Sequence, residues 1–131
     1  MALVYLPEKA WSTRYGPEYF TVAIVNVVHN EGGYAQYKLL VQNGKRNWYV
    51  LRRFSEFDKM RSSLPSMKGH KIPPLPPKSF CCRDLNPDYL ARRKSGLQVF
   101  LEDLLVIPHL AEEKGLRDFL QLPQSTKTFY V

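Results

Sequence analysis

Two adjacent arginines, Arg52 and Arg53, lie where a strand-like stretch of the sequence changes to a helical pattern. Apolar residues recur at helical spacing from Phe57 on, and Ser55 and Asp58 have the spacing of a helix N-cap and its reciprocal partner. A strand end held by sheet pairing aims an arginine more firmly than a loop does, and the planar fork of guanidinium donors matches a phosphate. The same residues also fit a surface arginine pair beside a core phenylalanine.

Two further cations extend this candidate phosphate site. Arg93 lies four residues after Tyr89 and four before Leu97, which places it on the apolar face of a predicted helix. A cation on that face needs an acidic partner, a route to solvent or a pocket that it lines. Lys78 ends the segment Lys71–Lys78, in which four prolines impose a stiff polyproline II rod. Such a rod holds the lysine in place at little entropic cost.

Residue patterns of catalysis and of metal binding are missing from the sequence. The three histidines, His29, His70 and His109, are far apart and show no metal-ligand spacing. The adjacent pair Cys81-Cys82 lacks the gap of a zinc knuckle, and no P-loop or nucleophile elbow is present. The sequence therefore predicts no enzymatic activity, no cofactor and no metal site.

Composition and charge predict one soluble domain with an anionic partner. A chain of 131 residues with a hydrophobic fraction of 44% can form a single core. No apolar run approaches the roughly 18 residues that cross a bilayer, and Ala2–Leu6 is too short for a signal-peptide core. Two adjacent cysteines cannot form a disulfide framework, which suits an intracellular compartment. The net charge of +7 indicates nucleic acid, an acidic protein or the cytoplasmic face of a membrane.

The order of the expected elements predicts an α+β fold. Three strand-like runs, Tyr19–Val28, Tyr34–Val41 and Arg46–Arg53, follow one another across the turn 29–33 and the hairpin signal Asn43-Gly44. Short connections of this kind join neighbouring strands of a three-stranded antiparallel meander. We expect this sheet to pack against a helical subdomain that follows the polyproline II segment.

The helical subdomain is expected to begin at Asn86-Pro87, an N-cap followed by proline at the first helical position. Its long apolar stripe stops before Pro108, and a last helical piece runs from Ala111 to Leu122. We expect an N-terminal arm over residues 1–17, one domain over 18–123 and a C-terminal tail over 124–131.

Three motifs in this order resemble those of a phox-homology (PX) domain, and the likeness extends from about Tyr19 to Leu122. The motifs are Arg-Arg-Phe-Ser-Glu-Phe (52–57), Pro-Pro-Leu-Pro-Pro-Lys (73–78) and Arg-Arg-Lys-x-x-Leu-x-x-Phe-Leu (92–101). PX domains bind phosphoinositide headgroups, most often phosphatidylinositol 3-phosphate on endosomal membranes. The resemblance therefore implies the PX fold in a cytoplasmic, sorting-nexin-like protein that is peripheral on endosomes and acts in membrane trafficking by recruitment, without catalysis.

The resemblance also implies roles for individual side chains. Arg53 would bind the 3-phosphate, and Phe54, at a position where the family usually has tyrosine, would support the inositol ring from one side. Lys78 would contact the 1-phosphate, and Arg93 would reach the ring hydroxyls at positions 4 and 5. Several cations around one phosphomonoester balance its charge of about −1.5 to −2. Arg52 would point to the opposite face of the strand, with a structural or a general membrane-attracting role.

Two other functions fit parts of the pattern. The same fold with a weak lipid site would act as a protein-interaction module, and Pro73-x-x-Pro76-x-Lys78 matches a ligand of SH3 domains. Nucleic-acid binding would suit the charge, but the basic residues are spread over separate elements and match no recognised binding module. We therefore expect a phosphoinositide-containing membrane as the partner, an SH3 domain as the alternative partner, and no nucleic acid.

The loop after Lys78 contains Phe80, Cys81 and Cys82, in the place of the membrane-inserting segment of the family. It either projects towards the lipid or folds back on the core, since cysteine is among the most buried residue types. If the loop inserts, transfer of Phe80 into the bilayer contributes about 1.5–3 kcal/mol before ordering costs.

We expect Phe80→Glu to weaken binding to phosphatidylinositol 3-phosphate vesicles by roughly tenfold or more, while affinity for a short-chain soluble headgroup stays nearly unchanged. Vesicle sedimentation and calorimetry measure the two affinities. Equal losses on both ligands, or a lower melting temperature, would show that Phe80 belongs to the fold.

Overall fold

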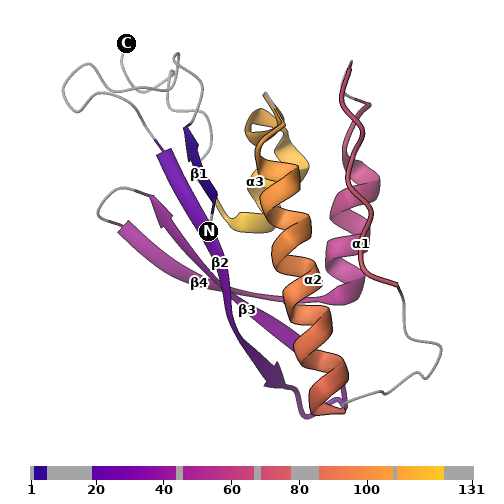
Figure 1. Ribbon diagram of the computed structural model, residues 1–131. Helices are drawn as coiled ribbons and strands as arrows, with labels where there is room; N and C mark the ends of the chain where they lie inside the picture. The colour runs from indigo at the N-terminus through magenta and orange to yellow at the C-terminus, as the bar shows by residue number, and fades with distance from the viewer. Residues whose placement is uncertain are drawn as a thin grey trace.

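The computed structural model describes residues 2–5, 19–43, 46–66, 69–77, 86–107 and 109–122. These residues contain a four-stranded antiparallel sheet with the strand order β1-β2-β3-β4 (Figure 1). The strands are β1 (Ala2–Tyr5), β2 (Tyr19–His29), β3 (Ala35–Asn43) and β4 (Arg46–Arg53). The expected meander of three strands is confirmed, and β1, within the segment predicted as an arm, extends it along the outer edge of β2.

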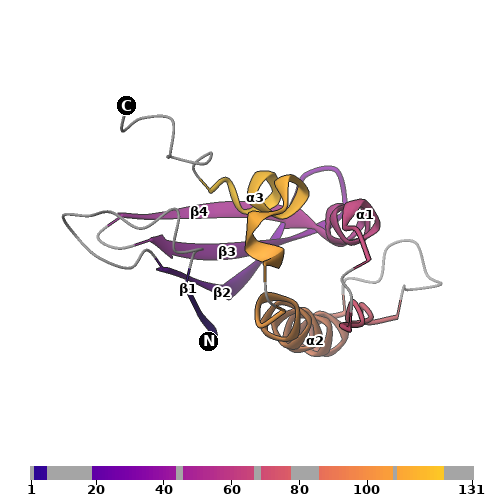
Figure 2. The same cartoon turned by 90° about the horizontal axis from the view of Figure 1, so that it is seen from above.

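The helical part of the chain lies on one side of this sheet (Figure 2). It consists of α1 (Phe54–Ser63), α2 (Pro87–Leu105), the 3-10 helix η2 (Leu110–Glu112) and α3 (Lys114–Leu120). The sheet therefore has one face towards the helices and another that no described helix covers. This is the predicted α+β arrangement. None of the described helices is long and apolar enough to cross a membrane.

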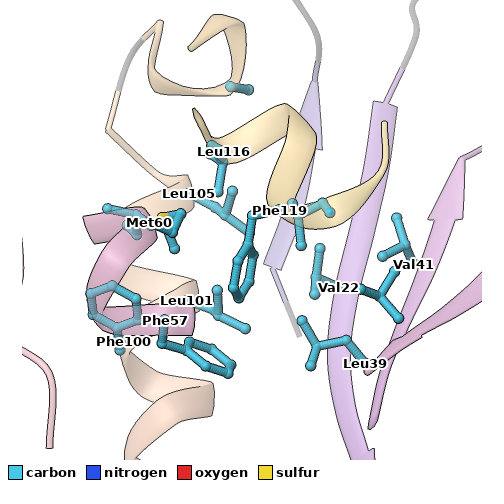
Figure 3. Packing of buried hydrophobic residues seen from close by; sticks show 14 of the residues in the cluster. Val22, Leu39, Val41, Phe57, Met60, Phe100, Leu101, Leu105, Leu116 and Phe119 are labelled. Carbon is cyan, nitrogen blue, oxygen red and sulfur yellow. The ribbon is translucent and has the colours of Figure 1, made fainter. Parts of the chain in front are cut away.

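The core fills the space between the sheet and the helices (Figure 3). Strand alternation turns Tyr37, Leu39 and Val41 of β3 inward, where each is at most 1% exposed. The ring of Phe57 in α1 meets the ring of Tyr37 edge to face, with their centroids 6.1 Å apart, and lies 4.9 Å from that of Phe119 in α3. The apolar stripe predicted for α2 is confirmed, and its buried residues are Leu90, Leu97, Phe100, Leu101, Leu104 and Leu105.

Helix α1 begins at Phe54, which corrects the predicted N-cap at Ser55. The cap residue is Arg53, the last residue of β4, and its backbone N–H donates a hydrogen bond of 2.8 Å to Oε1 of Glu56. Glu56 is the third residue of the helix, where a carboxylate satisfies an amide that has no partner within the helix. The strand therefore passes directly into the helix.

Helix α2 begins at the predicted residue, whereas the last predicted helix is divided into two pieces. Oδ1 of Asn86 accepts hydrogen bonds from the backbone N–H groups of Asp88 and Tyr89, at 2.9 and 3.2 Å, and proline follows the cap. The single helix expected over Ala111–Leu122 is divided into η2 and α3 because the backbone of Glu113 between them is extended.

The proline-rich segment is held between α1 and α2. Nε of Arg61 in α1 donates a hydrogen bond of 2.8 Å to the carbonyl of Pro73, and Leu75 packs against the core. On the other side, a Cβ atom added to Gly96 of α2 would stand 2.8 Å from Cγ of Pro76. Because a proline ring cannot move aside as a flexible chain can, the close approach of the segment to α2 depends on the missing side chain at Gly96.

We expect Gly96→Ala to lower the free energy of unfolding by about 1–2 kcal/mol, because the clash with Pro76 outweighs the gain in helix propensity. Urea denaturation measures the change. Ser95→Ala is the matched control, since Ser95 is exposed on the same helix and loses no contact of this kind. If both variants were equally stable, the proline segment would not be docked on α2 as described.

Candidate functional site

Segments that are distant in the sequence meet at one end of the molecule. Figure 1 places the β2–β3 turn, the β4–α1 junction and the start of α2 at this end. Tyr34 of the turn contacts Arg53, and Phe54 of the junction contacts Arg93 of α2. Arg93 also donates a hydrogen bond to the carbonyl of Pro77. Three of the four residues predicted to bind a headgroup therefore lie on these connected segments.

Arg53 lies exposed at the end of β4, against an aromatic ring. Its guanidinium carbon is 3.7 Å from the centre of the Tyr34 ring. The turn that carries Tyr34 is closed by Asn30, whose backbone N–H donates to the carbonyl of Tyr34 at 2.8 Å, and by Gly33, whose φ is 83°. No carboxylate in the described ranges forms an ion pair with Arg53. Its donors can therefore bind an external anion.

Arg93 is half-buried and lies between two aromatic rings. Its guanidinium carbon is 3.6 Å from the centre of the Phe54 ring and 5.2 Å from that of Tyr89. Nη2 donates a hydrogen bond of 3.4 Å to the carbonyl of Pro77. The sequence allowed an acidic partner, a route to solvent or a pocket for this cation, and the structure shows a pocket. The pocket has a volume of about 260 Å³ and is lined by Pro76, Pro77, Tyr89, Arg92 and Arg93. The face of Phe54, predicted to support an inositol ring, is covered by Arg93.

Buried polar atoms surround the Arg93 guanidinium. Nε of Arg93 and the hydroxyl oxygens of Tyr37 and Tyr89 are buried, and none has a hydrogen-bond partner among the described residues. Burial raises the pKa of the Tyr37 hydroxyl above its ordinary value, and the positive charge of Arg93 opposes this shift by lowering the pKa. The Arg93 guanidinium therefore acts electrostatically on the Tyr37 hydroxyl.

Arg52 points to the other face of β4, as predicted, and is part of the fold. Its Nε donates a hydrogen bond of 2.9 Å to the carbonyl of Phe119, and Nη2 donates one of 3.4 Å to the carbonyl of Asp118. Both carbonyls lie in the last turn of α3, where a cation also meets the negative end of the helix dipole. An ion pair of 3.6 Å connects Arg52 to Glu56 of α1.

Other predicted residues lie outside the described ranges. Lys78 and the three residues proposed for membrane insertion, Phe80, Cys81 and Cys82, are among them. Sequence analysis did not identify Tyr34 and Tyr37 as part of the site. Tyr34 adjoins a glycine turn and Tyr37 has the spacing of a core residue in a strand, so neither carries a local signal of binding.

Comparisons with known proteins agree on one family. The sequence profile of the PX domain family matches residues 40–123. The serine/threonine-protein kinase Sgk3 of Rattus norvegicus is 35% identical over 86 residues, which cover 66% of this chain and 17% of the kinase. Sorting nexin-16 of Homo sapiens is 32% identical over 114 residues, or 86% of this chain and 32% of that protein. The chain thus spans less than a third of the length of these curated relatives.

Solved structures show the same fold. A designed CISK-PX domain superposes with a TM-score of 0.70 at 30% identity, and the match covers 77% of this chain and 98% of that domain. The mouse SNX19 PX domain, determined with a bound sulphate ion, has a TM-score of 0.56 at 23% identity, with 79% and 96% covered. The second likeness concerns the fold alone. Together they confirm the fold class predicted from the sequence.

The different surroundings of the two arginines lead to a stability prediction. We expect Arg52→Ala to lower the free energy of unfolding by about 1–3 kcal/mol, because hydrogen bonds to the end of α3 are lost. Arg53→Ala should lower it by less, at most about 1 kcal/mol, since the side chain is exposed and loses only its contact with the Tyr34 ring. Thermal and urea denaturation compare the two variants. Equal stabilities would contradict a structural role that only Arg52 has.

Proposed function

Because the chain belongs to the PX domain family, we propose that it binds phosphatidylinositol 3-phosphate on endosomal membranes and recruits its parent protein there. Membership of the family supports a phosphoinositide-binding, membrane-targeting domain and peripheral association with membranes. The 3-phosphate and the endosomal membrane are our additions to this general function. On this proposal the domain acts by binding and carries out no reaction.

The observation that carries the proposal is the pair of guanidinium groups at the β4–α1 end of the molecule. Arg53 is exposed with its donors unpaired by any described carboxylate, and Arg93 lies in the wall of a pocket. Arginines held over the faces of aromatic rings keep their charge and their donors available to a ligand. We assign the 3-phosphate to Arg53 and the hydroxyls at positions 4 and 5 of the inositol ring to Arg93.

The remaining predicted residues complete the proposed site. Because the Arg93 guanidinium covers the face of Phe54, we propose that Phe54 supports the headgroup through Arg93. Lys78 follows Pro77, whose carbonyl accepts a hydrogen bond from Arg93, and we assign the 1-phosphate to this lysine. Phe80 and the two cysteines after it are proposed to enter the bilayer beside the bound headgroup.

The alternative of an SH3 ligand has less support. Ligands of SH3 domains present the prolines of a P-x-x-P pattern to an aromatic groove on the partner. Pro73 and Pro76 are both half-buried, and Pro76 packs closely over Gly96 of the same chain. An SH3 domain would have to detach this segment from α2 before it could bind.

Arg53→Ala tests the proposed function. We expect roughly a tenfold to hundredfold loss of affinity for phosphatidylinositol 3-phosphate vesicles and for its soluble dibutanoyl form, because a charge-assisted bidentate contact is lost. Sedimentation and calorimetry measure the two affinities against a series of phosphoinositides, in which the wild-type chain should prefer the 3-phosphate.

Arg46→Ala is the matched control, because Arg46 is an exposed arginine at the opposite end of the same strand. The control loses one charge and should weaken vesicle binding only slightly. If Arg53→Ala and Arg46→Ala reduced binding equally, the chain would be attracted to the membrane only by its overall positive charge, and the assigned 3-phosphate site would be wrong.

A further inference from the structure

Gly32, in the turn between β2 and β3, lacks a side chain for a reason that its backbone does not supply. The next residue, Gly33, has a φ of 83°, a conformation that favours glycine, whereas the φ of Gly32 lies outside that region. A Cβ atom added to Gly32 would instead stand 2.8 Å from Cε1 and 3.2 Å from Cδ1 of Tyr34. The ring of Tyr34 therefore occupies the space that a side chain at residue 32 would need.

Hydrogen bonds of the turn fix the backbone around this ring. The backbone N–H of Asn30 donates to the carbonyl of Tyr34 at 2.8 Å, and that of Gly33 donates to the carbonyl of Asn30 at 3.0 Å. Oδ1 of Asn30 accepts a hydrogen bond of 2.8 Å from the backbone N–H of Gly32. Nδ2 of Asn30 donates one of 3.2 Å to Oε1 of Gln36 in β3. The Tyr34 ring thus lies on a turn that is bonded within itself and to the sheet.

The same ring carries the guanidinium of Arg53, whose carbon atom is 3.7 Å from the ring centre. Strand register brings the two residues together, because Arg53 pairs with Gln36 near the start of β3. Arginine is a long side chain with many rotamers, and at an exposed strand end most of them are open to it. A contact with a ring face removes many of these rotamers before a ligand arrives, which lowers the entropic cost of binding.

We propose that Gly32 and Tyr34 are positioning residues for Arg53. Packed against Gly32, the Tyr34 ring forms a fixed platform that holds the Arg53 guanidinium where it binds the phosphate. Neither residue needs to touch the headgroup itself. The inference rests on the proposed function, because Arg53 is the residue to which we assign the 3-phosphate. It gives the turn between β2 and β3, which matches none of the three sequence motifs, a role in the affinity of the site.

Tyr34→Ala removes the platform and keeps Arg53. We expect affinity for soluble dibutanoyl phosphatidylinositol 3-phosphate to fall by about threefold to tenfold in calorimetry, because the guanidinium must then be ordered during binding. Tyr34→Phe keeps the ring and should restore most of the lost affinity. Tyr49→Ala is the matched control and should leave the affinity unchanged, since the Tyr49 ring also contacts a cation, Nζ of Lys38 at 4.2 Å, but lies outside the turn.

Gly32→Ala tests the platform without removing any group that contacts Arg53. The added methyl group would displace the Tyr34 ring, and we expect affinity for the soluble headgroup to fall by about twofold to fivefold. In a Tyr34→Ala background the same change should have no effect on affinity, because the ring that it displaces is absent.

A second double-mutant cycle makes the test specific for Arg53. In an Arg53→Ala background, Tyr34→Ala should cause no further loss of affinity, because the group that it positions is absent. A residue with a merely structural role would lower the melting temperature, and the affinity in both backgrounds. Additive losses in either cycle, or an unchanged affinity of Tyr34→Ala alone, would overturn the positioning role while the proposed function stands. If the wild-type chain bound none of the phosphoinositides, both proposals would fail.

Discussion

The pairing of β4 with β3 determines the direction of three consecutive side chains, and the proposed site depends on it. Strand alternation turns Arg52 inward, to the end of α3, and Arg53 outward to the exposed end of the sheet. Because α1 begins with no spacer, Phe54 turns back towards α2 and contacts Arg93. A shift of the register by one residue would exchange the faces of Arg52 and Arg53 and would place the structural cation in the site.

The cations of the site are stabilised by aromatic rings. Each contact of a guanidinium with a ring face contributes about 0.5–2 kcal/mol, more when the contact is partly buried. An ion pair with a carboxylate would also stabilise an arginine, but it would neutralise the charge and occupy the donors. Arg53 on Tyr34, and Arg93 between Phe54 and Tyr89, keep their positive charge available to an anion.

Rigid elements surround these side chains. On one side of the proline segment, the carbonyl of Pro73 accepts a hydrogen bond from Arg61. On the other side, Pro76 packs against α2 at Gly96. The carbonyl of Pro77, the last described residue of this segment, accepts a hydrogen bond from Arg93. A site assembled in this way has fewer side chains to order when a ligand arrives, and this lowers the entropic cost of binding.

The sequence by itself determined the strands β2 to β4, the Asn86 cap and the place of Arg93 on an apolar helix face, because each depends on residues close together in the chain. The start of α1 was predicted wrongly from Ser55, since Glu56 accepts the backbone N–H of Arg53 and the helix is therefore capped two residues earlier. Only the tertiary structure decided that Tyr34 lies under Arg53 and that Phe54 meets Arg93. Those contacts join segments far apart in sequence, and strand register and helix packing bring them together only in the folded chain.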